Sequence, residues 1–199
     1  MPAGPAPLGR RERNKQLKLE RITAAARELF SEHGVDEVTT QQIADAADIG
    51  TGTLFLYAKT KGELLLLVQN SSYADALVRG RAAAAATPDV LAALMAIVRP
   101  VVECNRAQVE NGRTYLREMV FGDPEEPHHR EALALTVQTE EAIAEVLRRD
   151  DRSDSNDAAT RAHVVSAIMF ITMAATFNAG RTVDELAQEI EDQVRVLMH

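Results

Sequence analysis

The sequence predicts an all-α protein of about nine or ten helices with a small N-terminal domain and a larger C-terminal one. Apolar residues recur at intervals of three and four in one segment after another, and no stretch alternates convincingly as a strand would. The composition, 46% hydrophobic and 26% charged, is ordinary for a soluble globular protein. A chain of 199 residues can also bury a substantial core.

Charge is divided unevenly along the chain, whose net charge is −8. Residues 1–62 hold nine Lys/Arg against eight Asp/Glu and include all four lysines, whereas residues 63–199 hold thirteen against twenty-two. An acidic protein can still bind DNA where its positive groups converge on one face, because phosphate contacts act within a Debye length of ~8–10 Å. The basic stretch at residues 10–21 is therefore either a solubilising tail or a phosphate or minor-groove contact.

The first third of the chain predicts a helix-turn-helix. Residues 1–13 are expected to form a flexible basic arm, and residues 14–33 an amphipathic helix closed by Gly34. Thr39 and Gln42 have the spacing of a capping box, and Asp48 stands where a tight turn needs a left-handed backbone. A second short helix is expected at about residues 51–57. Such a pair of helices is what DNA-binding proteins place in the major groove.

The rest of the chain predicts longer helices. A stiff helix should run from Thr60 to about residue 86, and Thr87 should cap the next, with Pro100 bending or breaking it. Thr182 and Glu185 form a second capping box. Between these the expected elements are a helix at 113–121, a loop at 122–127, a helix at 131–149, an acidic loop at 150–157, a helix at 158–179 and a last helix after 182.

The helix-turn-helix segment resembles the TetR-type bacterial transcriptional regulators. The resemblance covers about residues 17–68 and rests on the ordered set Ala25, Leu29, Phe30, Gly34, Thr39, Thr40, Ile43, Ala44, Ala47, Gly52, Thr53, Leu54, Phe55, Tyr57, Lys61, Glu63 and Leu64. It implies a DNA-binding domain at residues 14–60 and an effector-binding and dimerisation domain at 61–199. Phe55, Ala58 and Gly50 depart from the family pattern, which puts individual base or phosphate contacts in question.

The resemblance also implies which residues contact a double-stranded DNA operator. Threonine hydroxyls, lysines and helix N-termini suit phosphates, and Gln, Thr and Leu suit base edges. Without Arg or Asn on the second helix, arm arginines and DNA shape should supply part of the specificity. The predicted DNA-binding residues are Thr39, Thr40, Gln41, Gly50, Thr51, Thr53, Leu56, Tyr57, Lys59, Lys61, Arg10, Arg11 and Arg13.

The segment 158–179 is apolar on too many sides for the surface helix of a monomer. The resemblance implies that it packs with the 131–149 helix of each protomer in a four-helix dimer interface; the alternative is the central core helix of a monomer. A C2 dimer predicts a two-fold operator with half-sites ~34–36 Å apart. The predicted interface residues are Leu133, Val137, Ile143, Leu147, Val164, Ala167, Ile171, Ala174 and Ala175.

Methionines and aromatic residues in the C-terminal part could line a pocket for a small apolar effector, as the resemblance implies. For any one of them, ordinary core packing is the competing interpretation. The predicted ligand-binding residues are Met95, Tyr115, Met119, Phe121, Met169, Phe170, Met173 and Phe177.

Other chemistries find little support in the sequence. The single cysteine, Cys104, allows no intrachain disulfide, and the adjacent His128 and His129 point apart with no cluster to complete a metal site. No catalytic motif, cofactor motif or secretory h-region is present. The uncharged run from His163 to Gly180 is interpreted as a buried helix and not a membrane span.

These observations predict a homodimeric, ligand-responsive repressor of the bacterial cytoplasm that a small apolar effector releases from its operator. Two alternatives remain open: a regulator of the same fold without an effector, and an all-α protein that has lost DNA binding.

Overall fold

The computed structural model describes residues 9–149 and 155–198. Over these ranges the chain forms nine α-helices and one short 3-10 helix, without a strand, which confirms the all-α prediction. The elements are α1 (Arg10–His33), α2 (Thr40–Ala46), α3 (Thr51–Leu54), α4 (Lys61–Ala85), α5 (Val90–Arg106), α6 (Val109–Phe121), α7 (Pro127–Leu147), α8 (Ser155–Ala174), η1 (Thr176–Asn178) and α9 (Val183–Leu197).

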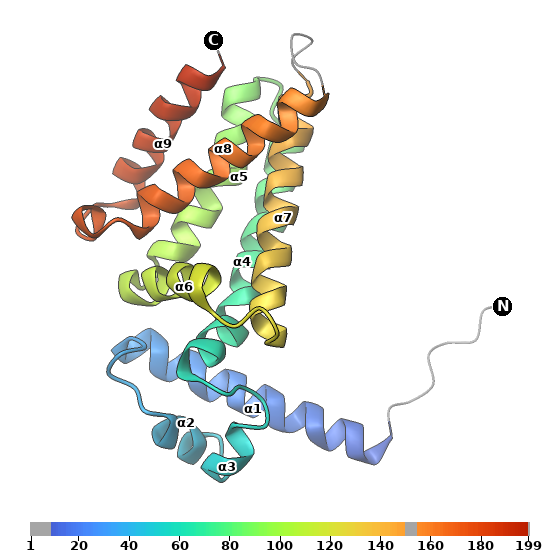
Figure 1. Cartoon of the computed structure of the whole chain (residues 1–199), viewed down its shortest axis with the longest axis vertical. Helices are drawn as coiled ribbons and strands as arrows, with labels where there is room; N and C mark the ends of the chain where they lie inside the picture. The colour runs from blue at the N-terminus through green and yellow to red at the C-terminus, as the bar shows by residue number, and fades with distance from the viewer. Residues whose placement is uncertain (1–8, 150–154, 199) are drawn as a thin grey trace, which may run out of the picture.

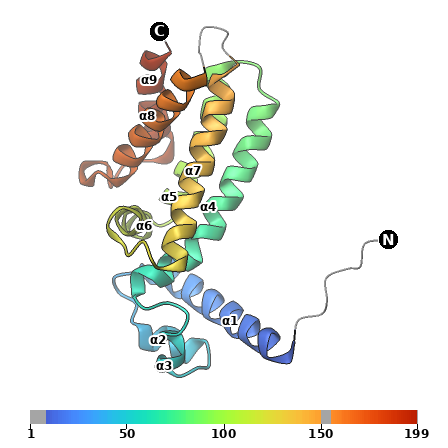
Figure 2. The ribbon, with the colours of Figure 1, turned by 45° about the vertical axis from the view of Figure 1, so that its right-hand side comes forward.

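The helices form two layers that meet at the start of α4 (Figure 1). In the lower layer α1 lies across the base of the molecule, with α2 and α3 beneath it. In the upper layer α4 packs mainly on α5 and α7, α7 packs on α8, and α5 packs on α9. Helix α6 runs crosswise between the layers, as the rotated view also shows (Figure 2).

Several helix ends follow the predicted local chemistry. Both predicted capping boxes form, at Thr39 and at Thr182. Thr60 caps α4 through its side chain, and Gly34 ends α1 with a φ of 78°, in the left-handed region that glycine adopts without strain.

Several boundaries differ from the prediction; α6 and α7, for example, each begin four residues earlier than expected, at Val109 and Pro127. Asp89, and not Thr87, caps α5, and its carboxylate accepts a hydrogen bond from the backbone N–H of Ala92. Pro100 lies inside α5 without ending it, because packing on α4, α7 and α9 offsets the backbone hydrogen bond that proline cannot make. Helix α8 ends at Ala174, where the chain turns into η1.

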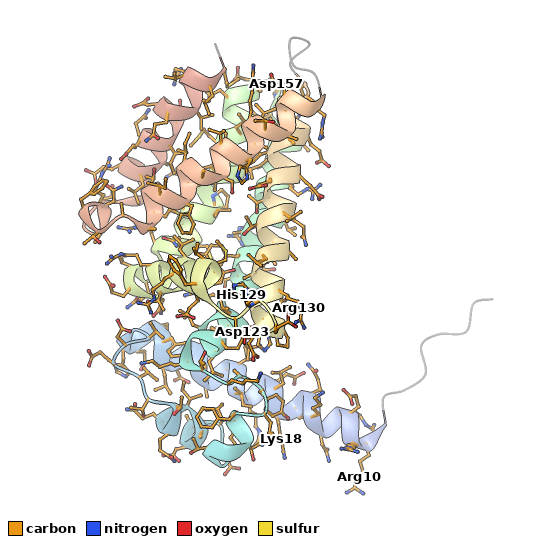
Figure 3. All side chains as sticks on the ribbon, viewed as in Figure 1. Arg10, Lys18, Asp123, His129, Arg130 and Asp157 are labelled. Carbon is orange, nitrogen blue, oxygen red and sulfur yellow. The ribbon has the colours of Figure 1, made fainter. Side chains whose placement is uncertain are left out.

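The predicted flexible arm is partly wrong. Helix α1 begins at Arg10, so Arg10, Arg11 and Arg13 are helical, and Figure 3 shows Arg10 at the free end of α1. Residues 1–8 of that arm, and residues 150–154 of the predicted acidic loop, lie outside the described residues. The remainder of that loop, residues 155–157, belongs to α8.

Candidate nucleic-acid interface and apolar cavity

The helix-turn-helix is built from local contacts around a small apolar core. Thr39 Oγ1 accepts a hydrogen bond from the Gln42 N–H, and the Thr39 N–H donates to Gln42 Oε1 at 2.8 Å. Asp48 adopts the predicted positive φ, 52°. Leu54 of α3 is buried, as is Ala58, which fills the position of a family aromatic with a smaller side chain. The second helix is shorter than predicted, because α3 ends at Leu54 and residues 55–57 form a turn.

Two predicted base-contacting residues bond to each other across the turn. Thr51 Oγ1 donates to Gln41 Oε1 at 2.7 Å, and Gln41 Nε2 donates to Asp45 Oδ1 at 2.7 Å. To contact a base, the Gln41 amide must exchange one of these partners. The side chain of Leu56 is apolar and has no hydrogen-bond partner to exchange. The residue is 84% exposed at the tip of the motif. Gly50 supplies the extended backbone that begins α3.

A basic groove runs between the first turns of α1 and the recognition helix α3. We call it the α1–α3 groove. Its lining residues are Arg10, Arg11, Glu12, Asn14, Lys15, Lys18, Thr53, Leu56 and Tyr57. The Tyr57 hydroxyl donates to the Lys15 carbonyl at 3.4 Å across the groove. Arg13, although predicted with its neighbours, does not line it.

Lys15 and Lys18 were missing from the predicted DNA-binding residues. Lys15 and Lys18 lie four and seven residues after Arg11, a spacing that puts all three on one face of a helix. The predicted helix began at residue 14, whereas α1 begins at Arg10, so this shared face was not recognised. The groove therefore gathers positive charge beside α3 in a protein of net negative charge.

The two other predicted lysines are engaged elsewhere. Lys59 forms an ion pair with Glu126 at the start of α7, and this carboxylate raises the pKa of the exposed Lys59 ammonium. Lys61 Nζ donates to the Asp36 carbonyl at 3.1 Å. The structure thus places Lys59 at the contact between the two layers, where tertiary proximity to α7 decides its partner, and its role as a DNA contact stays a prediction.

Buried polar bonds join the two layers. Asn111 of α6 accepts from the Val35 N–H at 2.7 Å and donates to the Phe30 carbonyl at 2.7 Å. At the start of α7, the buried Glu63 carboxylate accepts from the His128 N–H at 2.8 Å. Burial raises the pKa of Glu63 because desolvation disfavours its charged form. Figure 3 shows Asp123, His129 and Arg130 beside the start of α4, where the two layers meet.

The upper layer contains an apolar cavity of about 510 Å³ between α4, α5, α6, α7 and α8. Five of the predicted effector residues line it: Tyr115, Met119, Met169, Phe170 and Met173. Its other lining residues are Tyr73, Val101, Leu116, Val120, Ala132, Leu133, Leu135, Thr136, Thr139, Glu140, His163, Ser166, Ala167 and Ile171.

Three predicted effector residues lie elsewhere, which corrects that part of the prediction. Met95 packs against the core without reaching the cavity. Phe121 and Phe177 are each 82% exposed, because α6 ends at Phe121 and η1 turns Phe177 outward.

One wall of the cavity is a buried polar network that sequence reasoning missed. The rings of Tyr73 and Tyr115 stack with centroids 4.3 Å apart. The Tyr115 hydroxyl donates to Asn70 Oδ1, and Asn105 Nδ2 donates to the Tyr73 hydroxyl, both at 2.9 Å. Burial raises the pKa of both phenols, so they stay protonated at neutral pH.

The same network links the cavity to the contact between the layers. Asn70 Nδ2 donates to the His128 carbonyl at 2.9 Å and to Glu131 Oε2 at 3.0 Å. One buried amide thus bonds a cavity tyrosine and the first turn of α7.

The predicted dimer face divides into exposed and buried members. Val137 of α7 and Ile171 of α8 are 54% and 64% exposed, and Leu133, Val164 and Ala167 are also exposed. Ala174 and Ala175 are half-buried. Ile143 and Leu147 are buried within this chain, so their assignment to the interface is wrong; they face the chain's own core.

The environments of Cys104 and His129 indicate structural roles for these two residues. Burial raises the pKa of the Cys104 thiol to about 11, which suits a packed thiol and not a reactive one. His129 is buried, with Nε2 3.0 Å from the Met119 carbonyl. Within the described ranges, no cluster of His, Cys, Asp or Glu could hold a metal ion. No helix of the described residues has the length and apolarity to cross a membrane.

A helix-turn-helix beside a basic groove, joined to a helical bundle with an apolar cavity, is the architecture of a DNA-binding domain coupled to a ligand-binding one. Residues 22–68 match the family model described as bacterial regulatory proteins, tetR family. The N-terminal domain belongs to this family, and the whole chain has the fold of TetR-family transcriptional regulators. Regulators of the family are non-enzymatic DNA-binding proteins.

Solved structures share this fold across almost the whole chain. FadR of Thermus thermophilus, a TetR-family transcriptional repressor solved in complex with lauroyl-CoA, is 26% identical with a TM-score of 0.73, covering 90% of this chain and 92% of that one. PfmR, a TetR-family transcriptional regulator also from Thermus thermophilus, is 21% identical, with a TM-score of 0.62 over 87% of this chain and 96% of that one.

The fatty acid degradation regulator FadR of Bacillus halodurans is 14% identical, with a TM-score of 0.65 over 95% of this chain and 96% of that one. At such identities PfmR and this second FadR show the fold alone. Among curated proteins, none matches the sequence.

Proposed function

We propose that the protein is a homodimeric transcriptional repressor of the bacterial cytoplasm, released from a two-fold DNA operator by a small apolar effector. It acts by binding and not by catalysis. The proposed boundary between its DNA-binding and effector-binding domains lies between Thr60 and Lys61, where α4 begins. The α1–α3 groove and the exposed tip of α3 form the surface that takes DNA.

The apolar cavity is the observation that carries the effector proposal. Its volume of about 510 Å³ lies within the range of small-ligand pockets, roughly 300–1,000 Å³. A regulator without an effector would fill the inner part of this space, beside Tyr115, Met169 and Met173, with its own side chains, as protein cores are close-packed. Because FadR of Thermus thermophilus binds lauroyl-CoA, we propose that the occupant carries a long hydrocarbon chain.

The proposed coupling passes through α6 and the first turn of α7. Tyr115 and Met119 of α6 line the cavity, while Asn111 of the same helix bonds the lower layer. A ligand that binds only one arrangement of α6 would shift the population of the DNA-binding arrangement. A coupling of about 1–3 kcal/mol weakens operator binding roughly 5–150-fold.

The dimer is proposed to form through α7 and α8. Leu133, Val137, Val164, Ala167 and Ile171 place exposed apolar side chains on these two neighbouring helices. A second copy related by a two-fold axis would cover them and present two copies of α3 to successive turns of DNA.

Fluorescence anisotropy with the DNA flanking the gene tests the proposal. We expect specific, salt-dependent binding by two protomers or a multiple per site, with release by lauroyl-CoA. Thr136→Trp should fill the cavity and abolish release while leaving DNA binding intact, and Gln138→Trp on the exposed side of α7 is the matched control. Binding no tighter than to scrambled DNA would contradict regulation through that site. Equal release from Thr136→Trp would contradict the cavity as effector site.

A further inference from the structure

The rim of the apolar cavity carries a hydrogen-bonded pair, Glu140 of α7 and His163 of α8. Glu140 Oε1 lies 3.0 Å from His163 Nδ1. Since a carboxylate only accepts, the imidazole Nδ1–H donates, which fixes the tautomer of a neutral His163. The Glu140 side chain is 26% exposed and that of His163 75%, so the carboxylate is the inner member of the pair.

Among the described lining residues, Glu140 is the only carboxylate, and none is a lysine or an arginine. The imidazole of His163 is already bonded to Glu140, so at most it neutralises that carboxylate. An anionic ligand group would therefore find no unshared positive charge at the rim of this cavity.

Three hydroxyl groups of the wall are already committed, because Tyr115 donates to Asn70 while Thr136 and Thr139 donate to carbonyls of the preceding turn of α7. The hydroxyls of Tyr73 and Ser166 donate to no group among the described residues, and as neutral donors they suit the oxygen of an alcohol or an ester. A carboxylate entering the cavity would find these neutral donors but no positive charge to pair with. Burying an unpaired charge is strongly unfavourable, and a hydrocarbon chain with an uncharged group avoids that cost.

Building on the effector cavity proposed above, we propose that it selects long-chain molecules whose functional group inside the cavity is uncharged: an alcohol, an ester or a thioester. Glu140, held by His163, is the specificity-determining residue that excludes the free carboxylic acid of the same chain length. The protein thereby responds to the esterified or reduced form of a chain and not to its ionised acid.

Isothermal titration calorimetry near neutral pH with dodecanol, methyl dodecanoate and sodium dodecanoate tests this selection. Like charges a few ångströms apart repel by kilocalories at an intermediate dielectric, and screening at the rim reduces the effect. We expect the two uncharged ligands to bind at least about tenfold more tightly than dodecanoate, a difference of about 1.4 kcal/mol.

Glu140→Gln removes the negative charge while keeping the size of the side chain. We expect it to strengthen dodecanoate binding about tenfold and to change dodecanol binding less than about twofold. Glu141→Gln, an exposed neighbour that does not line the cavity, is the matched control and should leave both affinities unchanged. In His163→Gln, which removes the imidazole that holds Glu140 but leaves the carboxylate in place, dodecanoate should bind no better than in the wild type.

The outcomes distinguish a failure of selection by Glu140 from a failure of the proposed effector cavity. If the wild type binds all three ligands equally, or if Glu140→Gln folds and still rejects dodecanoate, the selection by Glu140 is overturned while the effector cavity stands. If none of the three ligands binds and lauroyl-CoA releases no DNA, the effector cavity itself is wrong and the selection falls with it. Thermal unfolding of each variant identifies any loss that comes from misfolding.

Discussion

The two layers of the molecule differ in how far apart along the chain their hydrogen-bonded residues lie. In the lower layer, helices α1 to α3, the Thr39–Gln42 capping box and the Gln41–Thr51 bond join residues at most ten apart. In the upper layer, helices α4 to α9, the Tyr115–Asn70 bond joins residues 45 apart. The helix start at Thr39 and the turn of the DNA-facing motif are therefore fixed by short-range chemistry, although α1 is joined to the motif by longer-range bonds, Tyr57 to Lys15 and Arg21 to Asp48. The cavity, in contrast, exists only once the bundle is assembled.

The comparison teaches where ligand and DNA can communicate. The polar contacts between the layers include Asn111 of α6 with Val35 and Phe30, Arg27 with Ser71, Lys61 with Asp36, and the Lys59–Glu126 ion pair. Beside them, Glu63 and His128 join the starts of α4 and α7. A shift of α6 or of the start of α7 must strain the contacts that these two helices make. The predictions below test the two layers and the contacts between them, from the largest expected effect to the smallest.

The basic groove should dominate DNA affinity. Changing Arg11, Lys15 and Lys18 together to Ala removes three phosphate-facing charges, so binding should weaken about 100-fold and the salt slope should fall by about 3. Anisotropy titrations over a salt series measure both quantities. The matched control removes Arg81, Arg99 and Arg195, which form surface ion pairs in the upper layer. An equal loss in the control would show that net charge matters and the groove does not.

The Asn111 side chain should be the strongest single contact between the layers. Asn111→Ala leaves the buried Val35 N–H and the Phe30 carbonyl without these partners, which should lower the free energy of unfolding by about 2–4 kcal/mol. Chemical denaturation measures the loss, and the exposed Asn14→Ala is the control. A loss below about 1 kcal/mol would mean that the two layers do not depend on this amide.

Local signals explain how much of the lower layer could be predicted. Thr39, Gln42 and Asp48 act on backbone groups a few residues away, so their identities and spacing suffice. Lys59 could not be assigned in the same way, because its partner, Glu126, is brought to it by the start of α7. The short span of α3 could not be predicted either, because a helix of about one turn is too short for the spacing of apolar residues to show where it ends.

The cavity was predictable in kind and not in detail. Met119 and Phe121 are both apolar and lie two residues apart, yet Met119 lines the cavity and Phe121 is exposed. The way α6 crosses the bundle determines which of its side chains reach the cavity. Ile143 and Val137 show the same limit: periodicity defines an apolar face without saying whether the chain or a partner covers it. The role of Asn70 could not be predicted from the sequence, because an asparagine is expected at the surface unless its buried hydrogen-bond partners are known.

Lys59 separates a DNA contact from a contact between the layers. If the ion pair with Glu126 is its role, Lys59→Ala should leave the salt slope of DNA binding unchanged and should reduce the release of DNA by ligand. Glu126→Gln should then have the same effect, although it leaves the DNA-facing charge in place. A decrease of about 1 in the salt slope for Lys59→Ala alone would return the residue to the DNA surface.

The smallest expected effect is a pH dependence of stability that comes from Glu63. Burial raises the pKa of this carboxyl in the folded protein above its ordinary value of 4.5. Between the two pKa values the folded state binds more protons than the unfolded state, so stability falls as pH rises through this window and is then constant. Glu63→Gln can still accept from the His128 N–H but does not titrate, so the stability of the wild type minus that of the variant should decrease with pH.

Urea denaturation midpoints across the acidic range measure this difference, with the exposed Glu145→Gln as control. A difference that increases with pH would mean that the bond from His128 outweighs desolvation and that this contact favours the charged carboxylate. The contact between the starts of α4 and α7 would then strengthen as the solution becomes neutral, the opposite of what burial alone produces.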